Sequence, residues 1–423
     1  MSGEPVAVVG GGPGGALLAY LLARAGVAVT LFESRSDFER EYRGDSLHPY
    51  TMELLDRLGL ADEVLELPHR KAAAFRFHTP HGVITAAGYA RLPTRFNYVA
   101  IMPQALLIDL LVRRAGEYPG FRLRTSTKVI GLLTGPDGRV RGVRYRDGGA
   151  GGGGEGELAT SLVVGADGRH STVRRLADIP ITSLGATTDL IWFRLPRRPQ
   201  DPPDADLDLY CGPGRYVGML GSDDHWRIGL GIPRGGYAAA RQAGVGVVQD
   251  FLRTHVPWLA DRAGLLTDFT QTSLLSVDIA AVARWHRPGL LLIGDAAHVI
   301  SPVGGNGILM AVQDAVSTAN VLVPVLRRGE PADADLARVE AQRVPAIAEV
   351  QAAQVRTERS LARARERNRL AAPPRFLRPI LALPVVQRRS ARSNAYGPRA
   401  PELDLAVLDA SAPGAGQPAA RRG

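Results

Sequence analysis

A run of glycines near the N-terminus has the spacing of a turn that binds a dinucleotide. In "GGGPGG", Gly10, Gly12 and Gly15 fit the pattern G-x-G-x-x-G directly after the apolar residues 6–9. Such glycines permit a tight turn and let a pyrophosphate approach the N-terminus of the following helix. Glu33 follows Gly10 by 23 residues, where a carboxylate accepts hydrogen bonds from an adenosine ribose. A carboxylate there disfavours a 2′-phosphate, so the pattern predicts FAD or NAD rather than NADP.

A second glycine-rich segment, "GDAAHVISPVGGNG" at residues 294–307, follows the apolar run "LLLI". The run delivers Asp295 into the interior, where its carboxylate can hydrogen-bond a polyol hydroxyl. Pro302 stiffens the loop, and the glycines of "GGNG" let the backbone approach a planar ring closely. Exposed N–H groups at the start of the next helix would stabilise negative charge on a reduced isoalloxazine. The segment therefore predicts a contact with a flavin.

A third motif, "VVGADGRHSTVRR" at residues 163–175, carries Asp167 in a turn between an apolar strand and a helix start with Ser and Thr. By itself it is equally typical of a purely structural junction. In the order G-x-G-x-x-G with Glu, then "GADGRHS", then "GDAAH" with "GGNG" and "QDA", the chain resembles the single-component FAD-dependent monooxygenases of the aromatic hydroxylase type, the para-hydroxybenzoate hydroxylase-like group A family. The resemblance covers roughly residues 5–326.

The resemblance implies an α/β fold. A Rossmann-like FAD-binding domain of the GR2 type would be interrupted by a mostly antiparallel β-sheet substrate domain, with a helical C-terminal region added. It also implies the chemistry: NADH or NADPH reduces FAD, O2 adds to form a C4a-hydroperoxide, and the distal oxygen goes to an electron-rich substrate, aromatic or polyketide-like. Such an enzyme belongs to secondary metabolism. The cofactor carries the reaction, while the protein positions it and excludes water.

Two smaller matches support the assignment of cofactor contacts. One is "MPQALLIDLL", residues 102–111, which places Gln104 where the family contacts FAD. "RGDSLHPYTMELLDRLGL", residues 43–60, resembles the family's flavin-contacting segment, in which Arg43 and the backbone around Asp45 and Ser46 lie along the flavin. Arg43 and Pro302 would lie near the ring. Leu309 departs from the family pattern, in which many members carry Asn, and Asn306 stands where Gln or an apolar residue is usual. The implied cofactor-binding residues are Gly10, Gly12, Pro13, Gly14, Gly15, Glu33, Ser34, Arg35, Arg43, Gln104, Asp167, Asp295, Pro302, Gly304, Gly305, Asn306 and Gly307.

The substrate would lie under the second sheet. Candidates for its wall are Trp192, Tyr210, Tyr216, Met219 and Trp226, and the alternative for each is an ordinary place in the sheet core. His48 and His298 adjoin the flavin motifs, where a structural or hydrogen-bonding role is favoured over that of a catalytic base. The nine His are scattered and there is one Cys, so no metal site is predicted.

Hydrophobic periodicity predicts the elements that position these residues. The sequence reads as a strand at 6–9, a helix to about 25 and a strand at 27–32. Alternation follows at 72–89, a helix at 102–118 and antiparallel hairpins at 123–146, with a mobile hairpin loop in "GGAGGGGEGE". Short strands fill 189–232, then come a helix at 238–255, a strand at 274–279 and a helix to about 326. The predicted FAD-binding domain comprises 1–71, 97–180 and 281–354; the sheet domain 72–96 and 181–280; the basic helical region 355–402; and a disordered tail 403–423.

Composition limits the remaining possibilities. The single Cys211 excludes an intrachain disulfide and fits a reducing, cytoplasmic compartment. No secretory signal is recognisable, and no run reaches the roughly 18 apolar residues of a membrane span. The net charge of +9 arises between residues 355 and 399, where twelve Arg face only Glu358 and Glu366. This region could contact an acidic partner, a membrane surface or RNA, although a solvated helix in an Arg-rich chain is favoured.

The expected partners are a small-molecule substrate and O2, without nucleic acid, in a monomer or homodimer. Several alternatives use the same scaffold. An FAD-dependent reductase would transfer no oxygen, and epoxidation or Baeyer–Villiger insertion would use the same flavin adduct. A halogenase is disfavoured because "HWRIGLGIP" matches W-x-W-x-I-P poorly and no lysine lies nearby. A module that only retains a nucleotide site would not turn over NADH or NADPH.

Overall fold

The computed structural model describes residues 4–39, 45–148, 153–302 and 304–409. Its first layer is a six-stranded sheet in the order β20-β21-β12-β1-β2-β8, parallel except for the β20–β21 pair. Every residue of β1, β2, β12 and β21 is buried, as expected for strands covered on both faces. The strands are β1 (Val6–Val9), β2 (Val29–Phe32), β8 (Phe121–Arg124), β12 (Leu162–Gly165), β20 (His286–Arg287) and β21 (Leu290–Leu292).

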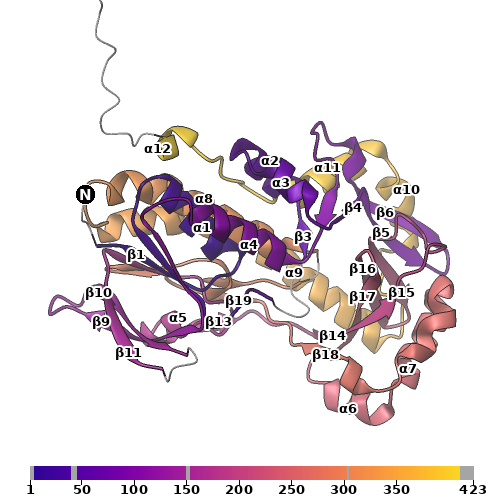
Figure 1. The fold of residues 1–423 in the computed structure, drawn as a ribbon. Coiled ribbons are helices and arrows are strands. Elements are labelled where there is room, and N and C mark those ends of the chain that lie inside the picture. The colour runs from indigo at the N-terminus through magenta and orange to yellow at the C-terminus, as the bar shows by residue number, and fades with distance from the viewer. Residues whose placement is uncertain (1–3, 40–44, 149–152, 303, 410–423) are drawn as a thin grey trace, which may run out of the picture.

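Helices cover one face of this sheet and a small sheet covers the other (Figure 1). The covering helices are α1 (Pro13–Arg24), α4 (Gln104–Ala115) and α8 (Asn306–Leu326). Helix α8 is long and apolar enough to cross a membrane, with a mean hydropathy of 1.5 over its most apolar stretch, but 78% of that stretch is buried. We therefore describe α8 as a core helix.

The small sheet differs from the predicted hairpins at both ends. It consists of β9 (Thr127–Thr134), β10 (Val140–Asp147) and β11 (Glu155–Ala159), paired antiparallel. Residues 123–124 belong instead to β8, which pairs parallel with β2. Residues 155–157, predicted as part of a mobile loop, are in β11 because their backbone pairs with residues 144–146. Residues 149–152 of that loop lie outside the described part of the chain.

The second main layer is a seven-stranded sheet in the order β18-β14-β17-β16-β15-β5-β6. All neighbours are antiparallel except β15 and β5, as the prediction of a mostly antiparallel sheet requires. One face packs against α7 (Gly246–His255) and the 3₁₀ segment Pro257–Leu265. The strands are β5 (Ala74–Thr79), β6 (Gly82–Gly88), β14 (Thr188–Pro196), β15 (Leu207–Gly212), β16 (Arg215–Gly221), β17 (His225–Pro233) and β18 (Ser273–Leu275).

Two predicted elements near this sheet are interrupted. The helix expected at 238–255 is split into α6 (Tyr237–Ala243) and α7, because Gly244 has a φ of +80° that no helix accommodates. The strand expected at 274–279 ends at Leu275, and the chain pairs again only in β19 (Ala280–Val282).

Short elements connect the two main sheets. Two three-stranded sheets lie in the orders β13-β19-β22 and β3-β7-β4. Their strands are β3 (Ser46–Leu47), β4 (Arg70–Ala72), β7 (Val99–Ile101), β13 (Ile181–Ser183), β19 and β22 (His298–Val299). The short helices are α2 (Pro49–Arg57), α3 (Ala61–Glu66) and α5 (Thr172–Leu176).

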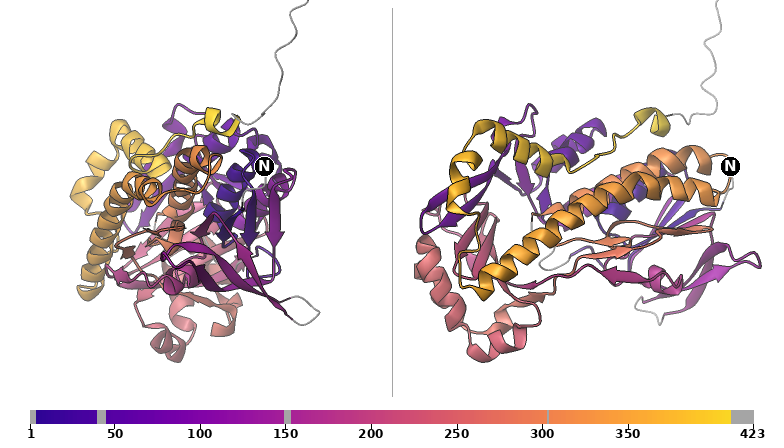
Figure 2. Two further views of the ribbon diagram at one scale, coloured as in Figure 1. Left: turned by 90° about the vertical axis from the view of Figure 1, so that its left-hand side faces the viewer. Right: turned by 180° about the vertical axis from the view of Figure 1, so that it is seen from behind.

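The longest element is α9 (Asp333–Glu366), a helix of 34 residues that runs beside α8 and continues past the second sheet (Figure 2). Near its start, the Arg343 Nε donates to Asp314 Oδ1 on α8 at 2.7 Å. Further along, the Glu358 carboxylate accepts the backbone N–H of Thr187 at 2.9 Å, next to β14. One helix therefore contacts both halves of the molecule, and it crosses the boundary expected at residue 355.

The chain ends with α10 (Arg378–Leu381), α11 (Pro384–Tyr396) and α12 (Leu405–Asp409). The predicted disorder from residue 403 is wrong for residues 403–409. Leu403 and Leu408 are buried in the main core, and the Leu408 carbonyl accepts a hydrogen bond from Arg327 at 3.2 Å. Burial of these two leucines offsets the entropy lost on ordering the segment. Residues 410–423 lie outside the described chain.

Candidate active site

A single cavity extends between the two main sheets. At one end it is bounded by the carboxyl ends of β1, β2 and β12, and at the other by one face of the seven-stranded sheet. Ligands bind at this edge of open parallel sheets. The cavity brings together these predicted cofactor residues: Gly10, Gly12, Pro13, Gly14, Gly15, Glu33, Ser34, Gln104, Asp167, Asp295, Pro302, Gly304, Gly305 and Gly307.

The first turn of α1 presents backbone to the cavity. Gly12 caps the helix without any side-chain hydrogen bond, and a Cβ there would meet no atom within 4 Å. Gly10 and Gly15 are different, because a Cβ on Gly15 would lie 2.1 Å from the Gly10 carbonyl oxygen and one on Gly10 would lie 2.5 Å from that of Ala166. Packing therefore requires glycine at positions 10 and 15. Gly12 instead leaves open space in which an anion can bind at the positive end of the helix.

Glu33 lies at the end of β2 and is buried. Its Oε2 accepts the N–H of Gly11 at 3.1 Å and its Oε1 accepts that of Arg35 at 2.9 Å. These bonds fix the carboxylate at the cavity wall, beside the glycine turn, as a ribose ligand requires. The Arg35 side chain points elsewhere: it is exposed, and its Nη1 donates to the Glu39 carbonyl at 3.4 Å.

A buried carboxylate on α8 holds the segment that carries Asp295. Asp314 Oδ2 accepts the N–H of Gly294 at 2.9 Å and lies 2.6 Å from His298 Nε2. Burial alone would raise the pKa of Asp314, but the charges of His298 and Arg343 and their hydrogen bonds keep that pKa below its ordinary value. His298 thus serves to anchor the loop, while Asp295 lines the cavity with Arg169 Nε 3.4 Å from its Oδ2.

The loop that would lie along a flavin ring is pressed against the segment at Ser46 and His48. Gly305 caps α8 with a φ of +69°, and a Cβ on it would lie 3.2 Å from Ser46 Oγ. His48 Nε2 is 3.2 Å from the Gly305 carbonyl oxygen, and burial lowers the pKa of His48 to about 4. The imidazole is therefore neutral and donates that hydrogen bond. Asn306 begins α8 but does not line the cavity, and Arg43 lies outside the described residues.

Asp167 lines the cavity, but its carboxylate already caps α5. Oδ1 accepts from the Ser171 hydroxyl, and Oδ2 accepts the N–H groups of Thr172 at 2.6 Å and Val173 at 3.1 Å. Its pKa is raised by burial, against the effect of these bonds. The carboxylate therefore shapes the turn of the second motif, and both of its oxygens are engaged within the protein.

The seven-stranded sheet forms a glycine floor in the cavity, which we define as Gly218 and Gly229; Gly231 follows two residues later on β17. Gly218 on β16 pairs with Gly229 on β17, and both line the cavity. The Trp192 ring lies over Gly229, where a Cβ would be 3.1 Å from it, and the Tyr216 ring lies over Gly231 at 2.8 Å. Two aromatic rings thus lie flat on glycines of a neighbouring strand, as aromatic side chains do over strand glycines.

The five predicted substrate residues divide between the two faces of the sheet. Trp192, Tyr216 and Met219 line the cavity, although the Met219 side chain packs in the core cluster on the α7 face. Tyr210 and Trp226 do not: the Tyr210 hydroxyl accepts from Trp258 Nε1 at 3.0 Å, and Trp226 Nε1 donates to Asp201 Oδ2 at 2.7 Å in the core under α7. Successive strand residues point to opposite faces, so these two belong to the ordinary sheet core.

Sequence reasoning missed a buried ion pair in the wall of the cavity. Arg227 on β17 binds Asp45 through its Nη1, and Asp45 Oδ1 accepts the N–H of Gln104 at 3.3 Å. Burial lowers the pKa of Arg227 to about 10, so the guanidinium is charged at neutral pH. Its Nε and Nη2 have no partner among the described residues. A lone Arg in the apolar strand "HWRIGLGIP" was the available signal.

Residues distant in sequence also reach the cavity. Tyr89, from the 3₁₀ turn after β6, donates its hydroxyl to Asn394 Oδ1 at 2.5 Å, and both line the cavity. Phe75 on β5 and Leu207 on β15 add apolar wall. Asn394 lies on α11, in the C-terminal region to which no site role was assigned. No local pattern marked it, because its position depends on how α11 packs against β6.

The residues present fit FAD. An open helix N-terminus faces the cavity beside a fixed carboxylate, Glu33, and a second carboxylate, Asp295, lies further along. Gln104 is buried at the wall, and its Nε2 has no partner within the described chain, so that N–H group is available to a ligand. Dinucleotide flavins need this combination of diphosphate, ribose and ribityl partners.

The fold and the cavity together define a flavoprotein oxidoreductase. The chain belongs to the FAD binding domain family, whose model matches residues 4–354. The 6-methylpretetramide 4-monooxygenase of Streptomyces rimosus is 38% identical to it over 344 residues, covering 80% of each chain. The protein is accordingly an FAD-dependent monooxygenase that takes its electrons from NADH or NADPH.

Solved structures agree on the fold. PqsL of Pseudomonas aeruginosa, described as a probable FAD-dependent monooxygenase, superimposes with a TM-score of 0.72 at 24% identity, covering 86% of this chain and 96% of that one. OxyS anhydrotetracycline hydroxylase of Streptomyces rimosus gives a TM-score of 0.68 at 24% identity, covering 93% and 76%. The predicted architecture, an FAD-binding domain with an interrupting sheet and a helical C-terminal region, is confirmed.

Proposed function

We propose that this monooxygenase hydroxylates a planar compound of several fused aromatic rings, of the polyketide type. The observation that carries the proposal is the glycine floor, where the open backbone of Gly218 and the Trp192 ring that covers Gly229 give the cavity a flat wall. Trp192 and Leu209 flank that wall, so a wide flat molecule has apolar contact on its faces. The similar enzymes named above act on 6-methylpretetramide and anhydrotetracycline, which supports the same substrate class here.

The chain's own residues would hold the cofactor along the cavity. The first turn of α1 would bind the diphosphate, Glu33 the adenosine ribose and Asp295 the ribityl chain. Pro302 and the backbone from Gly304 to Gly307 would face the ring. Bound FAD supplies the redox chemistry: it accepts a hydride from NADH or NADPH and passes one atom of O2 to the substrate. In this assignment residues 72–96 and 181–280 form the substrate domain, and the remaining core holds FAD.

Arg227 would act on charge near the reacting centre. Its guanidinium is held by Asp45 and keeps two N–H directions free toward the cavity. A fixed cation in a water-poor site stabilises an ionised oxygen much better than water does. The phenolic Tyr216 lies further along the floor, and burial raises the pKa of that hydroxyl, so it is a neutral donor. Apolar side chains on both flanks would exclude water from the reacting atoms.

The proposed cellular compartment is based on the composition and on the buried thiol. Cys211 is buried, and burial raises its pKa to about 12, so it is an inert thiol suited to a reducing compartment. We propose a cytoplasmic enzyme, monomeric or homodimeric, with a small-molecule substrate and O2 as its reaction partners.

The experiment is turnover of the purified, FAD-loaded protein with NADH and with NADPH. Anhydrotetracycline would serve as the multi-ring probe and 4-hydroxybenzoate as the single-ring control. We expect the multi-ring probe to stimulate NADH or NADPH oxidation and to gain one oxygen atom from isotopically labelled O2, detected by mass spectrometry. Stimulation by 4-hydroxybenzoate alone would contradict the substrate class. Oxidation without labelled product from either compound would contradict hydroxylation.

A further inference from the structure

The most exposed apolar side chains of the described chain gather at one corner of the molecule. Phe376 is 77% exposed and Val385 is 71% exposed. Ile380 and Leu383, about half exposed, follow Phe376 at spacings of four and seven residues, which places the three on one face of the turns around α10. Val83 is also half exposed and lies on β6, which α10 contacts. We call these five residues the apolar corner.

The segment that carries the apolar corner has charge of one sign. Residues 367–401 contain eight Arg and no Asp or Glu. Arg388, Arg389 and Arg392 on α11 are exposed, and no ion pair with a carboxylate is found for them among the described residues. Soluble surfaces usually intersperse both signs of charge, and exposed apolar side chains are usually scattered singly. Here apolar side chains and unneutralised cations share one face.

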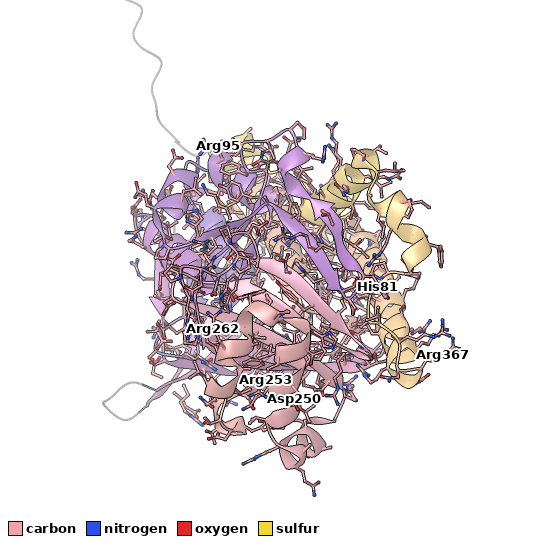
Figure 3. All side chains as sticks on the ribbon, turned by 90° about the vertical axis from the view of Figure 1, so that its right-hand side faces the viewer. His81, Arg95, Asp250, Arg253, Arg262 and Arg367 are labelled. Carbon is pink, nitrogen blue, oxygen red and sulfur yellow. The ribbon has the colours of Figure 1, made fainter. Side chains whose placement is uncertain are left out.

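The corner is held in place by the fold. Arg378 Nη1 donates to the His81 carbonyl at 2.6 Å and Nη2 to Thr79 Oγ1 at 2.6 Å, which ties α10 to the tip of the β5–β6 hairpin. Figure 1 shows α10 and α11 beside β5 and β6 at one end of the molecule, and in Figure 3 His81 lies next to these C-terminal helices. These hydrogen bonds therefore fix the position of the apolar corner on the folded protein.

One helix joins this surface to the active-site cavity. Val385 stands in the first turn of α11, whereas Asn394, nine residues on, lines the cavity. At 1.5 Å per residue the two are separated by about 14 Å. A surface seated on the corner would therefore lie close to the substrate end of the cavity, which is the end formed by Tyr89, Phe75 and the glycine floor.

We propose that the apolar corner and the α11 arginines dock the enzyme on an anionic lipid bilayer. Large apolar side chains flanked by Arg enter the interfacial layer of a membrane, while the cations pair with anionic head groups. The five apolar residues are enough for reversible attachment and too few for a span. Docking in this orientation brings the cavity to the lipid surface, where a fused-ring substrate with low water solubility would concentrate.

Co-sedimentation of the full-length, FAD-loaded protein with extruded vesicles tests this proposal. Vesicles of phosphatidylcholine alone are compared with vesicles that also contain phosphatidylglycerol. We expect binding to the anionic vesicles only, weakening as salt is raised. The double variant Phe376→Ser with Val385→Ser should weaken binding by about tenfold or more, because two side chains lose their apolar contact. The double variant Arg388→Gln with Arg389→Gln should weaken it at low salt.

Leu265→Ser is the matched control, since Leu265 is half exposed on the 3₁₀ segment under the seven-stranded sheet, away from the corner. It should bind like the parent, and all variants should keep the flavin spectrum and the melting temperature. No binding to anionic vesicles, or equal loss in Leu265→Ser, would overturn the proposal. So would a parent dimer, measured by light scattering, that Phe376→Ser with Val385→Ser converts to monomer, because the corner would then be an interface between two copies. These outcomes do not depend on whether a multi-ring compound is hydroxylated.

Discussion

The walls at the two ends of the cavity differ in composition: one is mainly backbone and the other mainly side chains. At the cofactor end, the wall is mainly backbone: the first turn of α1, the Gly304–Gly307 loop and the turn of the second motif. At the substrate end, the wall consists of side chains from six strands and from α11, set around the glycine floor. A backbone wall tolerates only particular residue types at fixed spacing, whereas a side-chain wall depends on register and packing. The first kind leaves a signature in the sequence and the second does not.

The largest effect is expected from glycine at the cofactor end. Gly15→Ala would place a Cβ 2.1 Å from the Gly10 carbonyl oxygen, so α1 must shift from β1. Such overpacking costs about 1–3 kcal/mol, or up to about a hundredfold in FAD affinity. The FAD-to-protein ratio and the melting temperature should both fall. Gly12→Ala is the matched control, because it meets no protein atom and should lower FAD retention at an unchanged apoprotein melting temperature. An equal fall in melting temperature in both variants would contradict the assignment of Gly15 to packing and Gly12 to FAD binding.

A smaller effect is expected at the substrate end, on the glycine floor that the side chains surround. Gly218→Val would put a branched side chain on the glycine floor, in space that the protein leaves open. We expect KM for a multi-ring substrate to rise about thirtyfold, with FAD binding unchanged. Trp226→Phe, on the opposite face of the same sheet, should lower stability by about 1 kcal/mol through loss of its bond to Asp201 and leave KM unaltered. A KM change in Trp226→Phe would refute the assignment of faces.

Asp295→Ala tests one of the few cofactor contacts assigned to a side chain. Removing the carboxylate deletes an acceptor for a ribityl hydroxyl and removes the carboxylate partner of Arg169, which keeps its hydrogen bond to the Ser276 carbonyl. We expect FAD to dissociate about tenfold more readily, which corresponds to about 1.4 kcal/mol. Asp295→Asn retains an acceptor, so its FAD affinity should lie between that of the parent protein and that of Asp295→Ala. Full FAD occupancy in Asp295→Ala after dialysis would remove Asp295 from the binding site.

The smallest effect is a pH dependence linked to His48. Its folded-state pKa of about 4 lies below the ordinary 6.5, so below pH 6.5 the unfolded chain binds a proton that the folded chain does not. Stability is therefore lost as pH falls from 6.5 toward 4, by roughly 1 kcal/mol at pH 5.5. His48→Gln keeps a donor for the Gly305 carbonyl and should flatten this part of the curve. Urea unfolding at pH 7.0 and 5.5 measures the difference, and an identical slope in both proteins would exclude His48.

The comparison of the two ends also explains what the sequence could predict. The glycine turn, Glu33 and the "GDAAH" segment identified the cofactor end because few other residues satisfy its geometry. Periodicity identified the strands of the second sheet, but it could not say which face meets the cavity, so Trp192 and Trp226 received the same assignment. The pair Arg227 and Asp45, 182 residues apart, and the reach of α11 to the cavity depend on tertiary packing alone. The prediction of disorder at residues 403–409 was wrong because Leu403 and Leu408 are buried in a core formed by residues distant in sequence.

Helix α9 spans the distance between the two kinds of wall, with Pro345 inside it between the two points of attachment. Arg343 secures the loop carrying Asp295 through Asp314, and Glu358, fifteen residues later, secures the start of β14, the strand that carries Trp192. The two attachment points are separated by about 22 Å of helix. A tilt of the helix by about 3° at one point would therefore displace the other by about 1 Å. Such a displacement is enough to lower the reaction rate strongly, because the reacting atoms must be aligned. The distance between the cofactor end and the substrate end thus depends on the shape of a helix that lines neither end of the cavity.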